Sequence, residues 1–170
     1  MLRPLLPDDV DEVYVGWLND PEVVRFIEAR HSPHTIASVN DYVTTCHTSQ
    51  DTHLLGIFEQ TGGLHVGNIK IGPVNMLHLC ASIGLIIGEK KRWRLGYATE
   101  AISLASRYAF CDLKLHKLTA GIVRGNEASL QAFRKNRFVE EGIRRKQNLL
   151  GGVWHDEIIL GLLAEDMAYA

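Results

Sequence analysis

The chain has 170 residues, of which 46% are hydrophobic and 22% are charged, a composition that fits one globular domain with enough apolar mass for a core. Its formal net charge of −2 argues against a nucleic-acid binder, because such proteins normally carry an excess of basic residues. The three cysteines have no C-x-x-C spacing, so neither a disulfide framework nor a zinc site is expected. Early acidic residues argue against a signal peptide, and no apolar run reaches membrane-spanning length. We therefore expect a cytoplasmic protein with a single domain over residues 1–170.

The N-terminal segment is predicted to form one strand and three helices. Leu2–Leu6 has the length of a short strand. Pro7 and the two acidic residues after it are typical of a helix start, because proline fits the first turn and carboxylates interact favourably with the helix dipole there. The string Asn-Asp-Pro at residues 19–21 ends this helix and starts a short one over Pro21–Ile27. Thr35 can cap a third helix that runs to about Thr45.

A region of antiparallel strands is expected next. His53–Glu59 and Leu64–Ile71 are predicted strands on either side of a Thr-Gly-Gly turn at residues 61–63. The glycine and proline within residues 72–75 break or bend the second of these strands. Leu77–Ile87 is the next predicted strand, and its apolar end is typical of a buried strand.

The C-terminal half alternates helices and strands. Tyr97–Asp112 has the apolar spacing of a long helix, and His116–Val123 is a strand. Asn126–Arg137 is a further helix, and Phe138–Asn148 and Val153–Leu162 flank a Gly-Gly pair in a terminal hairpin. The fold class is therefore α+β, with a mixed, largely antiparallel sheet. The strands before and after the long helix form its one parallel pair.

A basic turn that contains glycine separates the strand ending at Ile87 from the helix starting at Tyr97. The first N–H groups of a helix have no partner within it, and the helix dipole favours an anion there. Gly96 lets the backbone approach a ligand closely. The turn suits a pyrophosphate, although it contains neither the G-x-x-x-x-G-K-[ST] nor the G-x-G-x-x-G string. Positive charge surrounds it at Lys90, Lys91, Arg92 and Arg94.

The string RWRLGYATEA at residues 92–101 resembles the acetyl-CoA-binding loop of the GNAT N-acetyltransferase superfamily, whose pattern is Q/R-x-x-G-x-G/A. Trp93, Gly96 and Ala98 occupy the pattern positions, and Trp93 departs from the usual first residue. The longer string is similar to that of the ribosomal-protein N-terminal acetyltransferase branch. The resemblance covers nearly the whole chain and implies a GNAT fold, in which the two parallel strands splay apart around the pantetheine arm. It also implies acetyl-CoA as the cosubstrate and no metal.

The resemblance further implies which residues bind the cofactor. The backbone of Leu85, Ile86 and Ile87 would pair with pantetheine, and one N–H of that strand would polarise the thioester carbonyl. The phosphates would lie on the turn and the helix start, at Arg92, Arg94, Leu95, Gly96, Tyr97, Ala98 and Thr99.

The start of the helix over Asn126–Arg137 carries the expected proton donor. Asn126 and Ser129 would contact the pantetheine arm and the thiol region. Many members of the superfamily have a tyrosine seven residues after this asparagine, and this tyrosine acts as the general acid. This chain has Phe133 at that position, where the side chain would lie beside the cofactor. We therefore assign the acid to Ser129, with Asn126 beside it, and keep a water molecule as donor or direct release of the thiolate as the alternatives.

The acceptor amine needs a base, and the candidates are Glu28, Glu89, His155 and Asp156. The segment from Trp17 to Arg30 resembles enzymes that acetylate nucleotide-linked amino sugars. A diphosphate could meet Arg25 and Arg30, while Glu28 and His155 contact the acceptor.

The leading hypothesis is an acetyl-CoA-dependent N-acetyltransferase in which a primary amine, preferably of a nucleotide-linked amino sugar, attacks the thioester directly in a ternary complex. A protein N-terminus of the ribosomal-protein type is the second candidate acceptor, and a polyamine or small antibiotic is the third. A non-catalytic acetyl-CoA-binding domain is the alternative from another class, because Phe133 removes the usual acid. We expect a small-molecule partner, no nucleic acid and no membrane, with monomer or homodimer left open.

Overall fold

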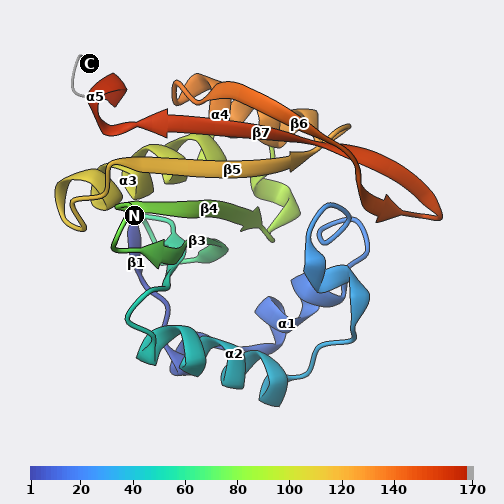
Figure 1. Ribbon diagram of the computed structural model, residues 1–170. Coiled ribbons are helices and arrows are strands. Elements are labelled where there is room, and N and C mark those ends of the chain that lie inside the picture. Colours follow the sequence, from blue (N-terminus) through green and yellow to red (C-terminus); the bar gives the residue numbers. More distant parts are fainter. Residues whose placement is uncertain (168–170) are drawn as a thin grey trace.

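Seven strands form one mixed sheet in the computed structural model, which describes residues 1–167 (Figure 1). Their order across the sheet is β1-β2-β3-β4-β5-β7-β6. β4 and β5 are parallel and the other neighbours are antiparallel, so the predicted α+β class is confirmed. The last three residues of the domain expected over residues 1–170 lie outside the described residues. The strands are β1 (Leu2–Pro4), β2 (His53–Phe58), β3 (His65–Asn75), β4 (Cys80–Ile87), β5 (Lys117–Val123), β6 (Val139–Leu150) and β7 (Val153–Leu163).

Helices cover both faces of the sheet (Figure 1). Successive strand residues point to opposite faces, so Leu55 of β2 joins the core under α3 and α4, whereas Leu54 joins the core under α1 and α2. The longer helices are α1 (Glu12–Asn19), α2 (Ile36–Thr48), α3 (Tyr97–Cys111) and α4 (Glu127–Lys135). The short elements are the 3-10 helices η1 (Pro7–Asp9), η2 (Glu28–His31) and η3 (Lys90–Arg92) and the terminal helix α5 (Ala164–Met167).

The first helix begins later than predicted. Pro7–Asp9 forms only the 3-10 turn η1, and α1 starts at Glu12, where the Asp11 side chain accepts a hydrogen bond from the Tyr14 N–H at 2.8 Å. The Asp9 carboxylate is engaged elsewhere, since it accepts from the Leu6 N–H at 2.8 Å and pairs with Arg3 at 2.5 Å. Asp11 is therefore the residue that caps the helix.

The helix predicted over Pro21–Ile27 is wrong, because the chain makes turns there and η2 follows. The Asp20 carboxylate accepts from the N–H groups of Glu22 at 2.9 Å and Val23 at 3.5 Å. Such a side-chain bond offers the backbone an alternative to continued helix. The backbone makes the helical bond from Val24 to Asp20 at 3.0 Å, and the next bond, from Ile27 to Val24, already has three-residue spacing. Several residues of this irregular segment line a cavity beside the C-terminal hairpin.

Of the break or bend predicted within residues 72–75, the structure has the bend, since β3 continues to Asn75 and its register against β4 shifts between Ile71 and Val74. The start of the next strand differs from the prediction. β4 begins at Cys80 rather than Leu77. The Asn75 side chain accepts hydrogen bonds from the N–H groups of Leu77 and His78, both at 3.0 Å, which holds these residues in a turn.

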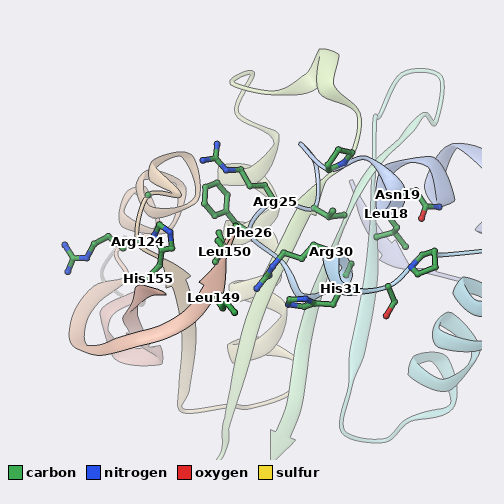
Figure 2. Close-up of a pocket in the computed structure, with 17 residues that line it drawn as sticks. Leu18, Asn19, Arg25, Phe26, Arg30, His31, Arg124, Leu149, Leu150 and His155 are labelled. Carbon is green, nitrogen blue, oxygen red and sulfur yellow. The ribbon is translucent and has the colours of Figure 1, made fainter. Parts of the chain in front are cut away.

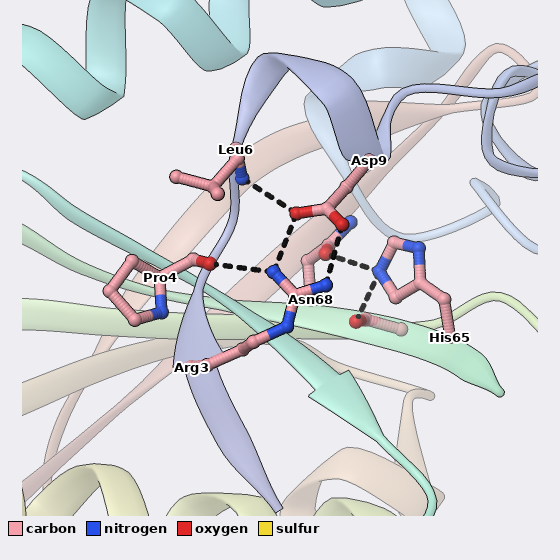
Figure 3. A network of polar contacts seen from close by, with 7 residues as sticks. Arg3, Pro4, Leu6, Asp9, His65 and Asn68 are labelled. Atoms are coloured by element: carbon pink, nitrogen blue, oxygen red, sulfur yellow. Dashed lines mark hydrogen bonds and ion pairs between the residues drawn. The ribbon is translucent and has the colours of Figure 1, made fainter. Parts of the chain in front are cut away.

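A polar network ties the N-terminal layer to the sheet (Figure 3). Arg3 of β1 donates to Asp9 of η1 through two nitrogens, at 2.5 and 2.7 Å, and its guanidinium lies 3.9 Å from the centre of the Phe58 ring. His65 of β3 stacks on the same Phe58 ring, with ring centroids 4.7 Å apart. Its Nε2 lies 2.9 Å from Asn68 Oδ1. Burial lowers the pKa of His65, so the neutral imidazole is the stable form in this layer.

Candidate functional site

β4 and β5 separate after a short stretch of pairing. The two strands are paired only at Cys80, Ala81 and Ser82 of β4, opposite residues 117–119 of β5. β4 nevertheless stays paired with β3 as far as Ile87, and β5 stays paired with β7 as far as Val123. The edge of β4 facing β5 is therefore free of a strand partner over residues 83–87, which include the predicted cofactor residues Leu85, Ile86 and Ile87. Beside Gly84 no protein atom would lie within 4 Å of an added Cβ.

The predicted phosphate turn lies at the mouth of this opening. Gly96 is the N-terminal cap of α3 and has a φ of 91°, a left-handed conformation that glycine adopts without a Cβ clash. The Glu100 N–H donates to the Gly96 carbonyl at 3.0 Å, so this is where the helical hydrogen bonds begin. The preceding N–H groups, of Tyr97, Ala98 and Thr99, belong to the first turn and have no partner within the helix. The backbone thus presents an anion site, and Leu95 beside it is exposed.

Three side-chain contacts hold the phosphate turn in place. The Trp93 indole N–H donates to the Ile87 carbonyl at the end of β4, at 2.7 Å. Arg92 donates through Nε to the Glu59 carboxylate at 2.5 Å, and the Tyr97 hydroxyl donates to the same oxygen at 2.6 Å. These bonds from Tyr97 and Arg92 lower the pKa of Glu59, which favours its charged form. Arg92, a predicted phosphate ligand, is thus paired within the protein.

Glu59 was missed by the sequence analysis. It follows β2 directly, and 38 residues separate it from Tyr97. No local pattern around Glu59 indicates either partner, since only the pairing of β2 with β3 and of β3 with β4 brings it to the turn.

α4 begins beside the opening. Asn126 caps this helix, because its Oδ1 accepts a hydrogen bond from the backbone N–H of Ser129 at 3.3 Å. The cap does not use the Ser129 hydroxyl, and this side chain is half-buried. Phe133 is 1% exposed and packs edge-to-face on Phe138, with ring centroids 4.9 Å apart. Its role beside the cofactor stays a prediction, and its side chain carries no proton to donate.

A cavity of about 770 Å³ lies between the segment after α1 and the tip of the β6–β7 hairpin (Figure 2). β5 ends at Val123, opposite Glu157 of β7, so the hairpin tip projects beyond β5 and forms one wall. The segment after α1 forms the other wall. Two hydrogen bonds hold the two ends of this segment together, since the Asn19 side chain donates to the His34 carbonyl at 2.8 Å and accepts from the His34 N–H at 2.9 Å. The lining residues are Leu18, Asn19, Pro21, Val24, Arg25, Phe26, Ala29, Arg30, His31, Ser32, Pro33, Arg124, Gly125, Leu149, Leu150, Gly151 and His155.

Two contacts connect this cavity to the phosphate turn. Lys90 of η3 donates to Asp20 and Glu22, both at 2.7 Å, so the turn holds the start of the cavity wall. Trp17 of α1 packs against Gly88 at the end of β4, where an added Cβ would come within 1.9 Å of the indole ring. Because Gly88 has no side chain, α1 can pack at the open end of β4. The cavity wall formed by the segment after α1 therefore lies next to that end.

The structure brings some of the predicted acceptor residues together and leaves others apart. Arg25, Arg30 and His155 line the cavity. Glu28 does not, since its side chain is 81% exposed and contacts Arg30 and His31. Asp156 pairs with Arg124 at 3.3 Å.

Glu89, the remaining candidate base, accepts from the Lys91 N–H at 3.2 Å and so caps η3. Among the candidate bases, His155 is thus the one that faces the cavity. Arg124 was not predicted, because it follows β5 without a recognisable motif.

Residues 1–167 contain neither a membrane-spanning helix nor a cluster of metal ligands. No helix in this part of the chain has both the length and the apolar character needed to cross a membrane. No group of three or more His, Cys, Asp or Glu side chains within it could hold a metal ion.

Comparison with known proteins places the chain in a family. Residues 1–139 match the model of the acetyltransferase (GNAT) domain. The chain is 31% identical to the probable N-acetyltransferase YjcK of Bacillus subtilis over 129 residues, which are 75% of this chain and 70% of the relative. It is 29% identical to spermidine N(1)-acetyltransferase of Escherichia coli K12 over 96 residues, 56% of this chain and 51% of that protein.

A solved structure has the same fold. The spermidine N-acetyltransferase from Vibrio cholerae in complex with CoA and spermine superimposes with a TM-score of 0.89 at 18% identity, covering 99% of this chain and 97% of that one. The expected splayed GNAT sheet is thereby confirmed, while the finer resemblance to the ribosomal-protein branch and to amino-sugar enzymes stays a prediction. With the domain match over most of its length, this chain belongs to the GNAT family and is an N-acetyltransferase.

Proposed function

We propose that the protein transfers the acetyl group of acetyl-CoA to the primary amine of a small molecule bound in the 770 Å³ cavity, by direct attack in a ternary complex. One observation carries this proposal. The open edge of β4 and the cavity meet at the end of β5, where Arg124 and Gly125 line the cavity and the next residue, Asn126, caps α4. A cofactor between β4 and β5 and an acceptor in the cavity would therefore approach each other at one place.

The residues at the opening suit acetyl-CoA. The first-turn amides of α3 and the open space beside Gly96 suit its pyrophosphate, and the free edge of β4 over residues 83–87 suits the amide groups of its pantetheine arm. Acetyl-CoA supplies an acetyl group that is already activated as a thioester. The protein binds and orients this group, and an N–H of Leu85, Ile86 or Ile87 can polarise the thioester carbonyl.

Proton transfer needs one base and one acid. We assign the base to His155, because it lines the cavity and an imidazole can accept the proton of the attacking amine. We assign the acid to Ser129, whose hydroxyl is not used by the helix cap and lies one turn from the start of α4. The amine nitrogen forms the new bond to the acetyl carbon as its proton passes to His155. The carbon–sulfur bond breaks and the departing sulfur receives a proton from Ser129, which regains one from water as His155 releases its own to water.

The acceptor has two leading candidates. A nucleotide-linked amino sugar is our first candidate, because Arg25 and Arg30 line the cavity as the sequence predicts for a diphosphate site. A polyamine is the second, because relatives such as the Escherichia coli protein are spermidine acetyltransferases.

The test is release of the CoA thiol, followed in the presence of acetyl-CoA and a panel of amines. The panel contains UDP-linked amino sugars, free amino sugars, spermidine and N-terminal peptides. We expect at least one small-molecule amine to accelerate thiol release. A protein that binds acetyl-CoA but responds to none of them would be a binding domain rather than an enzyme of small amines, and a response to peptides alone would favour the protein N-terminus.

A further inference from the structure

The cavity wall is cationic. Arginines from two separate parts of the chain line it, namely Arg25 and Arg30 before α2 and Arg124 after β5, and His31 and His155 add imidazoles. No aspartate or glutamate is among its lining residues within the described part of the chain. The protein as a whole carries a net charge of −2, so this local excess of basic groups is a property of the cavity and not of the overall composition.

Nearby carboxylates neutralise this wall only in part. Arg124 pairs with Asp156 at 3.3 Å, and Arg30 lies 3.3 Å from Glu28, whose side chain is 81% exposed. Arg25 makes no ion pair within residues 1–167, and its guanidinium lies 5.0 Å from the centre of the Phe26 ring. Pairs between exposed charges are weak, so these arginines keep the capacity to bind a ligand anion.

Two of the acidic residues of the same segment are directed away from the cavity. Asp20 and Glu22 both contact Lys90 of the phosphate turn at 2.7 Å. The contact with Lys90 lowers the pKa of Asp20 and so keeps its carboxylate charged and paired. The segment thus presents these two carboxylates to the cofactor side and its arginines to the cavity, while Glu28 is the carboxylate beside Arg30.

Arg30 is the best-placed anion ligand. Its side chain is 15% exposed, and one nitrogen, Nη1, donates to the Ile27 carbonyl at 2.7 Å, which fixes the guanidinium. The same nitrogen also donates to Glu28 Oε1 at 3.3 Å, whereas Nε and Nη2 have no hydrogen-bond partner within residues 1–167 and are left to bind a ligand. In Figure 2 the Arg30 side chain points into the space between the loop and the hairpin, whereas Arg124 lies at the rim beside His155.

Much of the remaining wall is apolar. Phe26, Leu149 and Leu150 are among the side chains that line it (Figure 2). A volume of about 770 Å³ falls within the range of pockets that enclose ligands larger than a simple amine. The cavity therefore offers an apolar face for the body of the acceptor and arginines for one end of it.

We propose that the acceptor is a primary amine that also carries an anionic group, and that Arg30 and Arg25, with Arg124 at the rim, bind this anion and disfavour polyamines. The proposal rests on the function proposed above and deepens it. A polyamine carries several positive charges and would meet arginines where it needs carboxylates, so like-charge contacts select against it. A phosphate, a diphosphate and a carboxylate share the required chemistry, since each accepts paired hydrogen bonds from a guanidinium.

The first test separates acceptors by charge. Thiol release is measured with spermidine, a free amino sugar, the same sugar as its phosphate, the same sugar linked to UDP, and an amino acid. We expect kcat/KM for at least one anionic acceptor to exceed the value for spermidine at least 100-fold. A preference for the sugar phosphate, the UDP-sugar or the amino acid identifies the source of the anion. A value for spermidine equal to or above all anionic acceptors would overturn the proposal.

The second test needs no turnover. Binding of inorganic pyrophosphate is measured by calorimetry with CoA at saturation, so that the phosphate turn is filled and the probe reports on the cavity. Arg30→Gln should raise the pyrophosphate Kd about tenfold or more, Arg25→Gln by less, and the matched control Arg107→Gln, an exposed residue on α3 away from the cavity, should leave it unchanged. Equal Kd values for Arg30→Gln and Arg107→Gln would overturn the assignment of the anion site.

Charge reversal supplies the converse test. The double variant Arg25→Glu with Arg30→Glu should lose use of the anionic acceptor and raise kcat/KM for spermidine about tenfold, with thermal unfolding as the check on folding. No gain toward spermidine in a folded double variant counts against the charge argument. If no amine is turned over by the unaltered protein while pyrophosphate still binds through Arg30, the proposed enzymatic function fails and the anion site stands.

Discussion

The cofactor side and the acceptor side of this protein are built in different ways. The cofactor side uses the backbone of regular elements that are adjacent in sequence, namely the free edge of β4 and the first turn of α3. The acceptor side uses side chains from irregular segments far apart in sequence, the turns after α1, the residues after β5 and the hairpin tip. Backbone amides bind any ligand of suitable shape and charge, whereas side chains can change with the substrate.

The difference explains how one fold serves several acceptors. In the proposed arrangement, the backbone of β4 and α3 would place the activated acetyl group at a fixed point, since that backbone depends on the sheet register. The cavity wall has few regular hydrogen bonds, so its side chains can differ without changing that point. The spermidine N-acetyltransferase of Vibrio cholerae and this chain have the same fold, and the cavity of this chain is lined by arginines.

The largest effect is expected where the two sides meet. Ser129→Ala removes the proposed proton donor and should lower kcat roughly 10-fold to 100-fold, the low end for general acid catalysis, because a thiolate is already a fair leaving group. Affinity for acetyl-CoA should change little. Thermal stability should also be preserved, since the cap bond to Asn126 comes from the backbone N–H of residue 129.

Asn126→Ala is the matched control for Ser129→Ala. It removes the cap and should cost about 1 kcal/mol of stability. Normal turnover in Ser129→Ala, with the chemical step shown to be rate-limiting, would leave water as the proton donor.

Gly96→Asp tests the cofactor side alone. A carboxylate at this position would project into the proposed pyrophosphate site, so the acetyl-CoA Kd should rise at least tenfold, which is about 1.4 kcal/mol. Gly62→Asp is a close control, because Gly62 also has a positive φ, of 83°, and open space around it, but lies in the turn after β2. Calorimetry should show normal affinity in Gly62→Asp. Equal losses in both variants would indicate backbone strain rather than a lost anion site.

The cofactor side is built from segments adjacent in sequence and the acceptor side from segments far apart, and this difference determines how well the sequence predicts each of them. The end of the strand at Ile87, the turn at Gly96 and the helix from Tyr97 are local features, and the structure has them where they were predicted, although β4 begins at Cys80 rather than Leu77. The helix over Pro21–Ile27 was predicted wrongly, because the Asp20 side chain competes for the backbone N–H groups that a helix would use.

Long-range contacts explain what the sequence analysis missed. Glu59 and Arg124 belong to their sites only because strand pairing brings them there, and neither is flanked by a motif. Arg25 and Arg30 were predicted from a family resemblance, and their common cavity depends on the turns that replaced the predicted helix.

Glu59→Gln should weaken the cofactor side without touching the acceptor side. Glutamine can still accept the Tyr97 hydrogen bond, but the ion pair with Arg92 is lost, so the phosphate turn is held less firmly. We expect the KM for acetyl-CoA to rise about three- to fivefold, the size of a partly exposed ion pair, with kcat and the acceptor KM unchanged. A larger fall in kcat than in acetyl-CoA affinity would mean that Glu59 acts in the chemistry and does not only position the turn.

The smallest effect is a pH dependence of the layer that supports the acceptor side. Burial lowers the pKa of His65, which lies against the Tyr14 and Trp17 rings of α1, with centroid distances of 5.6 and 5.0 Å. Because the unfolded chain then binds a proton more readily than the folded protein, this contribution to stability is complete above the ordinary histidine pKa of about 6.5. It is lost as pH falls from there toward the lower pKa of the folded state.

The free energy of unfolding should therefore drop between pH 7.5 and pH 5.0 by about 1 kcal/mol or less, as followed by urea titration. His65→Gln should have a smaller drop over this interval, even if it is less stable at both pH values, because it removes the titrating group.

His53 has a pKa lowered mainly by burial and contributes in the same direction, but it contacts Tyr108 of α3, on the cofactor side. Protection factors, which correct for the slower intrinsic amide exchange at low pH, should accordingly fall in α1 at pH 5.0 in the unaltered protein. In His65→Gln this fall on acidification should disappear from α1 and persist near His53. Equal slopes of stability against pH in the two proteins would show that His65 does not couple the acceptor-side layer to pH.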